Sequence, residues 1–358
     1  MLEARESVRN LPTYHPPLGG REGLRLDFNE NTVGCSPRVL ARLREITAEE
    51  IACYPAREPI EAVVADCLGI KPNELLLTNG VDEAIHLLCE TFLRPGDEAL
   101  IVVPTFAMYA ISAAATGARV ITVPAGTDFQ FPTSDLLSRL TPRTRLIALA
   151  NPNNPTGSVA EPAALLEIAG RAPHAAILVD EAYFEFYGRT LLGQWRSVPN
   201  LFVARTFSKA YGLAGLRVGV LTGNAEHIPL VSRVSSPYNV NTVGLACLPI
   251  ALGDQNYIRE YVDQVRQGRD ELQQWFSQWG VRYWPSQANF VLANFGPLKS
   301  GLIQSMRGRG ILVRDRSRDY GCEGCVRITL GTTEQTTRLL QALRVALAEI
   351  GAKEVATK

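Results

Sequence analysis

The sequence predicts an α/β protein with a large domain, built on a mostly parallel central sheet, and a small α+β domain. From residue 74 onward, short apolar runs alternate with segments of helical periodicity, which is typical of repeated βα units with helices on both faces of a sheet. After a long amphipathic segment at 254–279, this alternation changes to a mixture of strands and helices. The length of 358 residues also exceeds what one hydrophobic core usually supports. We therefore expect an N-terminal arm at 1–27, a large domain at 28–253 and a small domain at 254–358.

Composition and charge disfavour several classes of protein. The 36 Lys and Arg residues balance the 36 Asp and Glu residues without a basic run, so nucleic acid is not an expected partner. The chain begins without an apolar signal core, and no stretch approaches the roughly 20 apolar residues of a membrane span, so no membrane is expected either. The seven cysteines are scattered, and the close pair Cys322 and Cys325 has no histidine at ligand spacing, so we expect reduced thiols and no metal. A cytoplasmic location is the expectation.

The first elements are an irregular arm and a helix. Proline and glycine interrupt the first thirty residues, so the arm must be held by packing on other parts of the chain. Ser36 followed by Pro37 then predicts the start of a helix, because proline is favoured at the first helical position.

Periodicity predicts the elements that follow. Strands of the large domain are expected at 75–77, 99–103, 119–123, 144–150, 176–179 and 200–206, with helices at 82–93 and 134–140. In the small domain, 254–279 is expected to form a helix capped by Asp254. It is followed by expected strands at 289–293, 311–313 and 326–330 and expected helices at 300–307 and 333–350.

Three consecutive strand ends carry polar residues suited to catalysis. Asn154, Asp180 and Lys209 each follow a predicted strand, and open α/β sheets bind their ligands at this edge. Three glycines follow Lys209 with Arg217 among them, so backbone and a fork-shaped cation can approach a bulky group. A lysine nucleophile beside an anion-binding arginine predicts a phosphorylated carbonyl cofactor. The glycine spacing is not Gly-x-Gly-x-x-Gly, so a nicotinamide dinucleotide is not predicted.

Further positions are suited to binding anions. Gly80, Val81 and Asp82 lie at the predicted start of a helix, where free N–H groups and the helix dipole attract phosphate. Arg327 lies within an apolar strand, where a charge is costly unless an anion accompanies it. Arg314 follows another strand, and a surface position among other charged residues is the competing interpretation for it.

Motifs along essentially the whole chain resemble the fold-type I pyridoxal-phosphate aminotransferases, and most closely the histidinol-phosphate aminotransferase family. The motifs that carry the resemblance are Asn10-Leu-Pro-Thr-Tyr14, Asp27-Phe-Asn-Glu-Asn31, Asn151-Pro-Asn-Asn-Pro-Thr-Gly157, Asp180-Glu-Ala-Tyr183, Ala204 to Gly219 and Cys325-Val-Arg-Ile-Thr-Leu-Gly331. Each motif alone is also compatible with an ordinary turn or strand end. Their joint occurrence in this order makes a purely structural role remote.

The resemblance implies pyridoxal 5'-phosphate as the cofactor and assigns a role to each matching residue. Lys209 would tether the cofactor and later move a proton, and Asp180 would pair with the pyridine nitrogen. Asn154 and Tyr183 would donate to the phenolic oxygen, and Phe106 would stack on the ring. The residues expected to hold the phosphate are Gly80, Val81, Asp82, Thr206, Ser208 and Arg217.

The resemblance also implies a homodimer with shared active sites and a phosphorylated substrate. Tyr54 matches a tyrosine that reaches the cofactor of the neighbouring subunit. Tyr14, Arg314 and Arg327 match residues that hold the phosphate of the substrate. The implied reaction is amino transfer from histidinol phosphate to 2-oxoglutarate in histidine biosynthesis.

Other functions remain open at this stage. The same arginines could bind the carboxylate of an aromatic amino acid, so an aromatic amino-acid aminotransferase is the nearest alternative. A threonine-phosphate decarboxylase and a cofactor-binding regulator without turnover are more distant. Thr32 and Val33 replace the proline and aromatic residue of the family pattern, so a change at the substrate entrance is expected.

Overall fold

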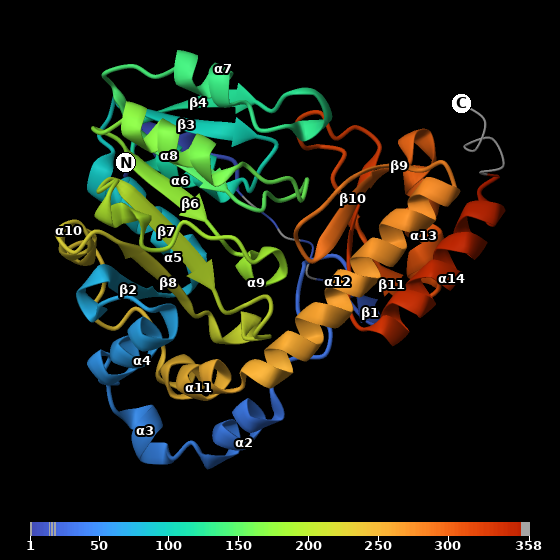
Figure 1. The fold of residues 1–358 in the computed structure, drawn as a ribbon, viewed down its shortest axis with the longest axis horizontal. Coiled ribbons are helices and arrows are strands. Elements are labelled where there is room, and N and C mark those ends of the chain that lie inside the picture. The colour runs from blue at the N-terminus through green and yellow to red at the C-terminus, as the bar shows by residue number, and fades with distance from the viewer. Residues whose placement is uncertain (1, 14, 16, 18, 352–358) are drawn as a thin grey trace.

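The computed structural model describes residues 2–13, 15, 17 and 19–351. In Figure 1 the largest sheet lies at the left and a smaller sheet at the right, with the long helix α12 (Gln255–Gln278) running beside the smaller one. The predicted helix at 254–279 is therefore confirmed almost to the residue. The prediction that the Asp254 side chain caps this helix is wrong, because it accepts no hydrogen bond from the backbone of the first turn. It accepts a hydrogen bond from Ser36 Oγ instead.

A seven-stranded sheet forms the centre of the larger part, with the strand order β2-β8-β7-β6-β5-β3-β4. Its strands are β2 (Leu75–Thr78), β3 (Glu98–Val103), β4 (Arg119–Pro124), β5 (Thr144–Ala150), β6 (Ala176–Asp180), β7 (Leu201–Thr206) and β8 (Gly219–Gly223). Only β8 runs against the others, since it is antiparallel to both of its neighbours. The prediction of a mostly parallel sheet is confirmed. β8 itself was not predicted, because its glycines belong to a stretch interpreted as a loop.

Helices cover both faces of this sheet, as the continuous apolar strands predict. Along β5, Leu146 and Ala148 face one apolar cluster, which includes residues of α5 (Gly80–Phe92) and α6 (Met108–Ala115). Ile147 and Leu149 face the other, which includes residues of α8 (Pro162–Arg171). The helices of this part are α2 (Pro37–Glu45), α3 (Ala48–Ala52), α4 (Glu58–Leu68), α5 (Gly80–Phe92), α6 (Met108–Ala115), α7 (Thr133–Ser138), α8 (Pro162–Arg171), α9 (Phe184–Tyr187), α10 (Ile228–Ser232) and α11 (Thr242–Gly253).

The smaller part contains an antiparallel sheet with the order β12-β13-β10-β9. Its strands are β9 (Arg282–Trp284), β10 (Phe290–Asn294), β12 (Arg314–Asp315) and β13 (Cys325–Thr329). The helices α13 (Lys299–Gly308) and α14 (Thr333–Glu349) pack together beside α12. In a separate two-stranded sheet, β1 (Leu24–Arg25) from the N-terminal region pairs with β11 (Ile311–Leu312). This pairing ties the beginning of the chain to its last third, after the short helix α1 (Glu6–Arg9).

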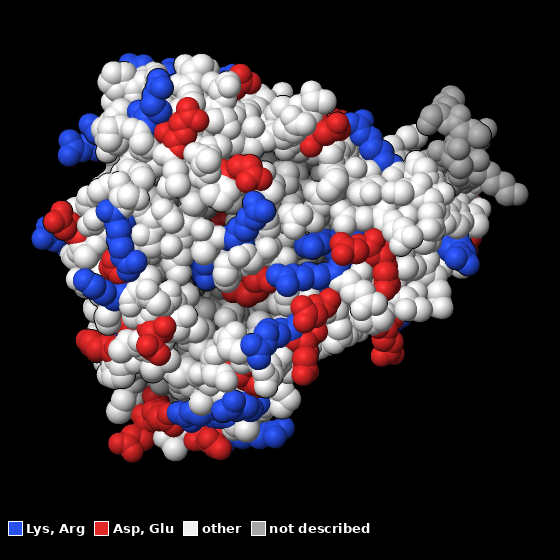
Figure 2. All heavy atoms as spheres, viewed as in Figure 1, with Lys and Arg blue, Asp and Glu red and all other residues white. Residues whose placement is uncertain are grey.

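The surface carries both signs of charge. Figure 2 shows Lys and Arg interspersed with Asp and Glu on the face in view, without a large patch of one sign. Among the helices of the described residues, none is long and apolar enough to cross a bilayer.

Candidate active site

The predicted strand ends lie side by side at one edge of the large sheet. β5, β6 and β7 are consecutive in the sheet, and Ala150, Asp180 and Ala204 are in register. The backbone N–H of Asn151 donates to the carbonyl of Asp180 at 2.8 Å, so the loop that carries Asn154 leaves the sheet beside the aspartate. The parallel register thus brings together residues from three segments of the chain.

Lys209 is only partly exposed, and its amino group points at backbone rather than at a carboxylate. Its Nζ donates to the carbonyl of Phe28 at 3.0 Å. Burial and the nearby positive charge of Arg327 lower the pKa of Lys209 to about 8. An appreciable fraction of the lysine is therefore a neutral amine near neutral pH, which is the nucleophilic form.

Asp180 is a buried carboxylate without a cationic partner. It is 5% exposed and accepts hydrogen bonds from the Ala182 backbone at 2.9 Å and the Tyr109 hydroxyl at 2.5 Å. No Lys, Arg or His side chain of the described residues forms an ion pair with it, and burial raises the pKa of Asp180 to about 6. A protonated ring nitrogen would supply the missing cation, so the environment of Asp180 fits the expected cofactor.

Three segments form a cradle of hydrogen-bond donors around the start of α5. Gly80 opens this helix at φ 75°, and a Cβ added there would lie 2.7 Å from Nη2 of Arg217. Arg217 also donates to Asp82 at 2.9 Å and keeps 43% of its side chain exposed, so it can still contact a ligand. Thr206 and Ser208 are buried, and the Ser208 backbone N–H donates to Thr206 Oγ1 at 3.1 Å. Together with the free N–H groups of the helix, the cradle fits a phosphate group.

The small sheet contributes a pair of adjacent arginines. Arg314 and Arg327 are directly opposite each other on β12 and β13, where like charges repel. Arg327 is 4% exposed and donates to the Asp27 carbonyl at 2.7 Å and to Asn154 Oδ1, while its Nε has no partner among the described residues. Burial and the positive charge of Arg316 lower the pKa of Arg327 to about 9. A bound anion would relieve both the repulsion and the burial cost.

Arg314 is less exposed than the surface interpretation predicts. Its side chain is partly buried, and its guanidinium lies over the ring of Phe28 at 4.9 Å from the centroid. Arg21 contacts the same ring at 4.3 Å and is bound by Asp27 and Glu30. In contrast, no carboxylate of the described residues forms an ion pair with Arg314. Arg314 therefore remains available for an anionic ligand.

The Asp27 to Asn31 motif contributes contacts that sequence reasoning did not assign. Asn29 donates to the Tyr183 hydroxyl at 2.9 Å, and its backbone N–H donates to Thr329 Oγ1 at 3.1 Å. These partners are 154 and 300 residues away along the chain. The motif was visible in the sequence, but no local pattern predicts partners at such separations.

Tyr109 is a second residue that sequence reasoning missed. Its hydroxyl donates to Asp180, and its ring lies edge-on to Phe106, with centroids 5.9 Å apart and an interplanar angle of 88°. A tyrosine within a short apolar helix reads as an ordinary core residue, so the sequence carried no signal for this contact.

Two predicted residues stay predictions, since Tyr54 is expected at the site of a neighbouring subunit and Tyr14 is not described. Tyr54 is 76% exposed and stacks on Tyr238, with ring centroids 4.0 Å apart. Tyr14 lies outside the described residues.

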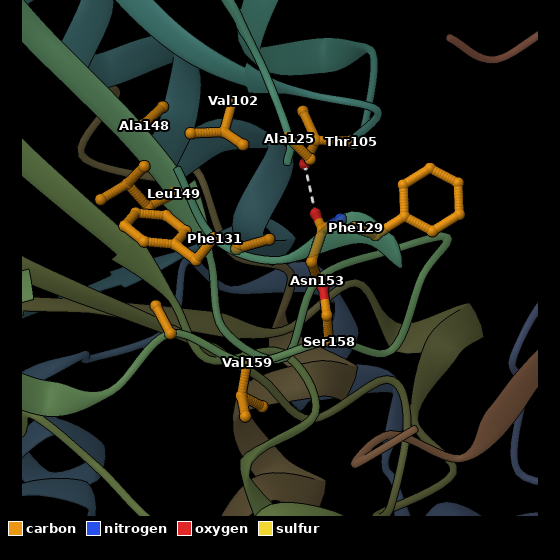
Figure 3. Close-up of a pocket in the computed structure, with 12 residues that line it drawn as sticks. Val102, Thr105, Ala125, Phe129, Phe131, Ala148, Leu149, Asn153, Ser158 and Val159 are labelled. Carbon is orange, nitrogen blue, oxygen red and sulfur yellow. Dashed lines mark hydrogen bonds between the residues drawn. The ribbon is translucent and has the colours of Figure 1, made fainter. Parts of the chain in front are cut away.

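One hollow lies beside the loop that carries Asn154, and another lies beside the segment at 23–33. Figure 3 shows the smaller one, about 20 Å³ in volume, beside the Asn154 loop, where Thr105 Oγ1 donates to Asn153 Oδ1 at 2.7 Å. Its size and apolar lining suit little more than one water molecule. The larger hollow, about 570 Å³, is lined in part by Thr32, Val33 and Gln335. The two residues that depart from the family pattern thus border an open space.

Comparisons with known proteins agree with this geometry. A sequence model of the family described as aminotransferase class I and II matches residues 21–343. A histidinol-phosphate aminotransferase of Geobacillus sp. (strain WCH70) is 34% identical over 97% of this chain and 99% of its own length. Histidinol-phosphate aminotransferase 2 of Methylococcus capsulatus is 35% identical over 94% of this chain and 96% of its own length. The crystal structure of the Sinorhizobium meliloti histidinol-phosphate aminotransferase with pyridoxal-5'-phosphate has a TM-score of 0.88 at 25% identity and covers 98% of this chain and 99% of its own.

Proposed function

The chain belongs to the aminotransferase class I and II family, and from this premise we propose that it transfers the amino group of histidinol phosphate to 2-oxoglutarate in histidine biosynthesis. The family depends on pyridoxal phosphate. When bound, this cofactor supplies an aldehyde that condenses with primary amines and a ring that takes up electron density from the substrate carbon. The choice of histidinol phosphate as the amino donor rests on the cross-strand pair of Arg314 and Arg327.

The residues around the strand ends would hold the cofactor. Asp180 would pair with the ring nitrogen, which its burial without a cation supports. Asn154 and Tyr183 would contact the phenolic oxygen, and Phe106 would cover the ring face. The phosphate would lie in the cradle formed by Gly80, Val81, Asp82, Thr206, Ser208 and Arg217.

Lys209 would hold the cofactor and handle the proton. Its Nζ has a lowered pKa, so in the neutral form it can accept a proton from the substrate carbon and return it at a neighbouring atom. The carbonyl of Phe28 accepts a hydrogen bond from this Nζ and orients it.

The two arginines favour a phosphorylated amino donor over an aromatic amino acid. A phosphate monoester carries up to two negative charges near neutral pH, whereas a carboxylate carries one. Arg327 is buried with no partner for its Nε among the described residues, and Arg314 has no carboxylate partner there, so a dianion balances the pair better. We further propose Tyr14 as a third contact to the substrate phosphate.

We propose a homodimer in which Tyr54 reaches the site of the other subunit. The support is the exposed, stacked pair of Tyr54 and Tyr238, because aromatic residues are enriched at interfaces between subunits. Mixing a Lys209→Ala variant with a Tyr54→Phe variant tests this, since a shared site would restore activity in the hybrid. Sedimentation at a single-chain mass would contradict the dimer.

We also propose the division into an arm at 1–27, a large domain at 28–253 and a small domain at 254–358. The break in α/β alternation before α12 supports it. The seven free cysteines, including the buried Cys322 and Cys325, support a reducing compartment such as the cytoplasm.

Half-reactions on the purified protein with its yellow cofactor bound test which amine is the amino donor. Histidinol phosphate or phenylalanine is added without a keto acid, and the absorbance of the cofactor is followed to its amino form. We expect histidinol phosphate to convert the cofactor much faster at equal concentration. Faster conversion by phenylalanine would transfer the function to aromatic amino acids and leave the cofactor contacts as proposed.

A further inference from the structure

Tyr109 joins the two residues proposed to contact the cofactor ring. It lies in the first turn of α6 and is 1% exposed. Its hydroxyl donates to Asp180 Oδ2 at 2.5 Å, and its ring abuts the Phe106 ring edge-on. One buried side chain therefore contacts both the partner of the ring nitrogen and the residue expected over the ring face.

The hydrogen bond can run in only one direction. Burial and the negative charge of Asp180 raise the pKa of Tyr109 well above its ordinary value, so the phenol keeps its proton and donates. Asp180 Oδ1 is occupied by the Ala182 backbone N–H. With one donor on each oxygen, the plane of the carboxylate is fixed.

We propose that Tyr109 is a positioning residue for the cofactor, whose hydroxyl fixes the Asp180 carboxylate and whose ring fixes Phe106. The proposal rests on the proposed roles of Asp180 and Phe106 and is independent of the identity of the amino donor. A carboxylate that could rotate or take up a proton would pair poorly with a protonated ring nitrogen.

Other groups around Asp180 favour its protonated form, so the hydrogen bond from Tyr109 matters for keeping Asp180 negatively charged. Burial is the largest cause of the raised pKa of Asp180, and the carboxylates of Asp82 on α5 and of Glu181 raise it further, while the hydrogen bond from Tyr109 lowers it. Tyr183 is also buried close by, where it keeps its proton. We therefore expect that removal of the Tyr109 hydroxyl raises the pKa of Asp180 beyond its present value of about 6.

Equilibrium dialysis of the holoenzyme over a range of pH tests the proposal without any substrate. In Tyr109→Phe, we expect roughly 10- to 100-fold weaker retention of pyridoxal phosphate, because a hydrogen bond to a charged group is lost. The pH below which the cofactor is released should also rise, because Asp180 takes up a proton more readily. Tyr109→Leu should additionally reduce the visible circular dichroism of the bound cofactor, since the Phe106 ring loses its support.

Two controls separate positioning from general packing. Tyr261→Phe removes another buried hydroxyl, which accepts from the Thr32 backbone at 3.2 Å, and should retain the cofactor like the parent. In an Asp180→Asn background, Tyr109→Phe should no longer shift the pH of release. The proposal is overturned if Tyr109→Phe behaves like the parent, if Tyr261→Phe loses as much cofactor, or if the shift persists without Asp180. A failure of the histidinol phosphate assignment would appear in the half-reactions and leave these outcomes unchanged.

Discussion

At the scale of single residues, Arg327 shows how a fork-shaped cation differs from a simple charge. Its two terminal nitrogens are already directed by the Asp27 carbonyl and by Asn154, so the plane of the guanidinium is set before a ligand arrives. Lysine has one strongly hydrated ammonium and cannot reproduce this planar geometry. The orientation of the side chain, in addition to its charge, therefore matters for binding.

We predict that Arg327→Lys raises the KM for the amino donor about 10- to 100-fold, because the charge stays and the oriented, charge-assisted hydrogen bonds are lost. Steady-state kinetics with each donor measure the effect. Arg189→Lys is the matched control, since its exposed ion pair with Glu161 should contribute little. An unchanged KM for every donor and acceptor would remove Arg327 from the substrate site.

The lowered pKa of Lys209 predicts a pH dependence. The rate at which cofactor-free protein captures pyridoxal phosphate should rise with pH and level off above about 8, because only the neutral amine reacts. Burial is the largest cause of the lowered pKa, and the charge of Arg327 is the next. In Arg327→Met the profile should move to higher pH, and rapid-mixing absorbance measures it. A shift to lower pH would contradict the electrostatic coupling of the two residues.

The residues most readily predicted from the sequence are those whose partners are set by the sheet. Asp180 and Lys209 follow buried strands, and parallel register alone brings such strand ends together. Tyr109 and Asn29 were missed because their contacts depend on how separate elements pack. No spacing in the sequence encodes a hydroxyl that meets a carboxylate 71 residues away.

At the scale of elements, the loop that carries Asn154 is fitted tightly against the small sheet. Gly157 has φ 74°, and a Cβ added there would collide with Ser286. Its carbonyl accepts from the Gln287 backbone N–H at 2.9 Å. The loop therefore owes its position to the absence of a side chain at one residue.

We predict that Gly157→Ala destabilises the protein by about 1–3 kcal/mol, through overpacking and a strained backbone. It should also weaken cofactor binding, because Asn154 moves with the loop. Thermal unfolding and cofactor retention measure the two effects. Gly170→Ala is the control, since it lies in α8 with open space around its Cβ and should be neutral or slightly stabilising. Equal thermal stability and equal cofactor retention of the two variants would disprove the tight fit of the loop against Ser286.

The predictability of an element follows its length and apolarity. The strands β3, β5, β6 and β7 were predicted because each contains an uninterrupted run of four or five apolar residues, which leaves few alternatives. β1, β9 and β12 have two or three residues and no periodicity of their own, and they exist only through pairing. α5 begins at Gly80, two residues before the predicted start. The sequence predicts a later start because glycine is unfavourable within a helix, whereas the tertiary structure makes Gly80 helical.

At the scale of the whole molecule, the segment at 24–31 links the four-stranded sheet to the active-site edge of the seven-stranded sheet. Leu24 and Arg25 pair with β11, the Asp27 carbonyl accepts from Arg327, and Asn31 Nδ2 donates to the Ala210 carbonyl beside Lys209. The change of architecture near residue 254 was evident in the sequence as a change of periodicity. The sequence did not indicate that the N-terminal segment crosses between the two parts, because its contacts are made with residues about 180 to 300 positions away.

Asn29 is the centre of this link and gives the last prediction. It is 1% exposed, has a left-handed φ of 56°, and bonds Tyr183 on one side and Thr329 on the other. Asn29→Ala should lower the free energy of unfolding by about 3 kcal/mol, from two lost hydrogen bonds and backbone strain. It should also lower kcat, because the Tyr183 hydroxyl loses the donor that orients it.

Asn29→Gly separates the two contributions to that loss. It removes the same hydrogen bonds but accepts the left-handed backbone, so it should cost about 1 kcal/mol less than alanine. Urea unfolding measures both variants, with the exposed Asn256→Ala as a control expected within about 0.5 kcal/mol of the parent. If Asn29→Ala kept the stability and kcat of the parent, the link between the two sheets would have to lie in other contacts of the segment, such as that between Asp27 and Arg327.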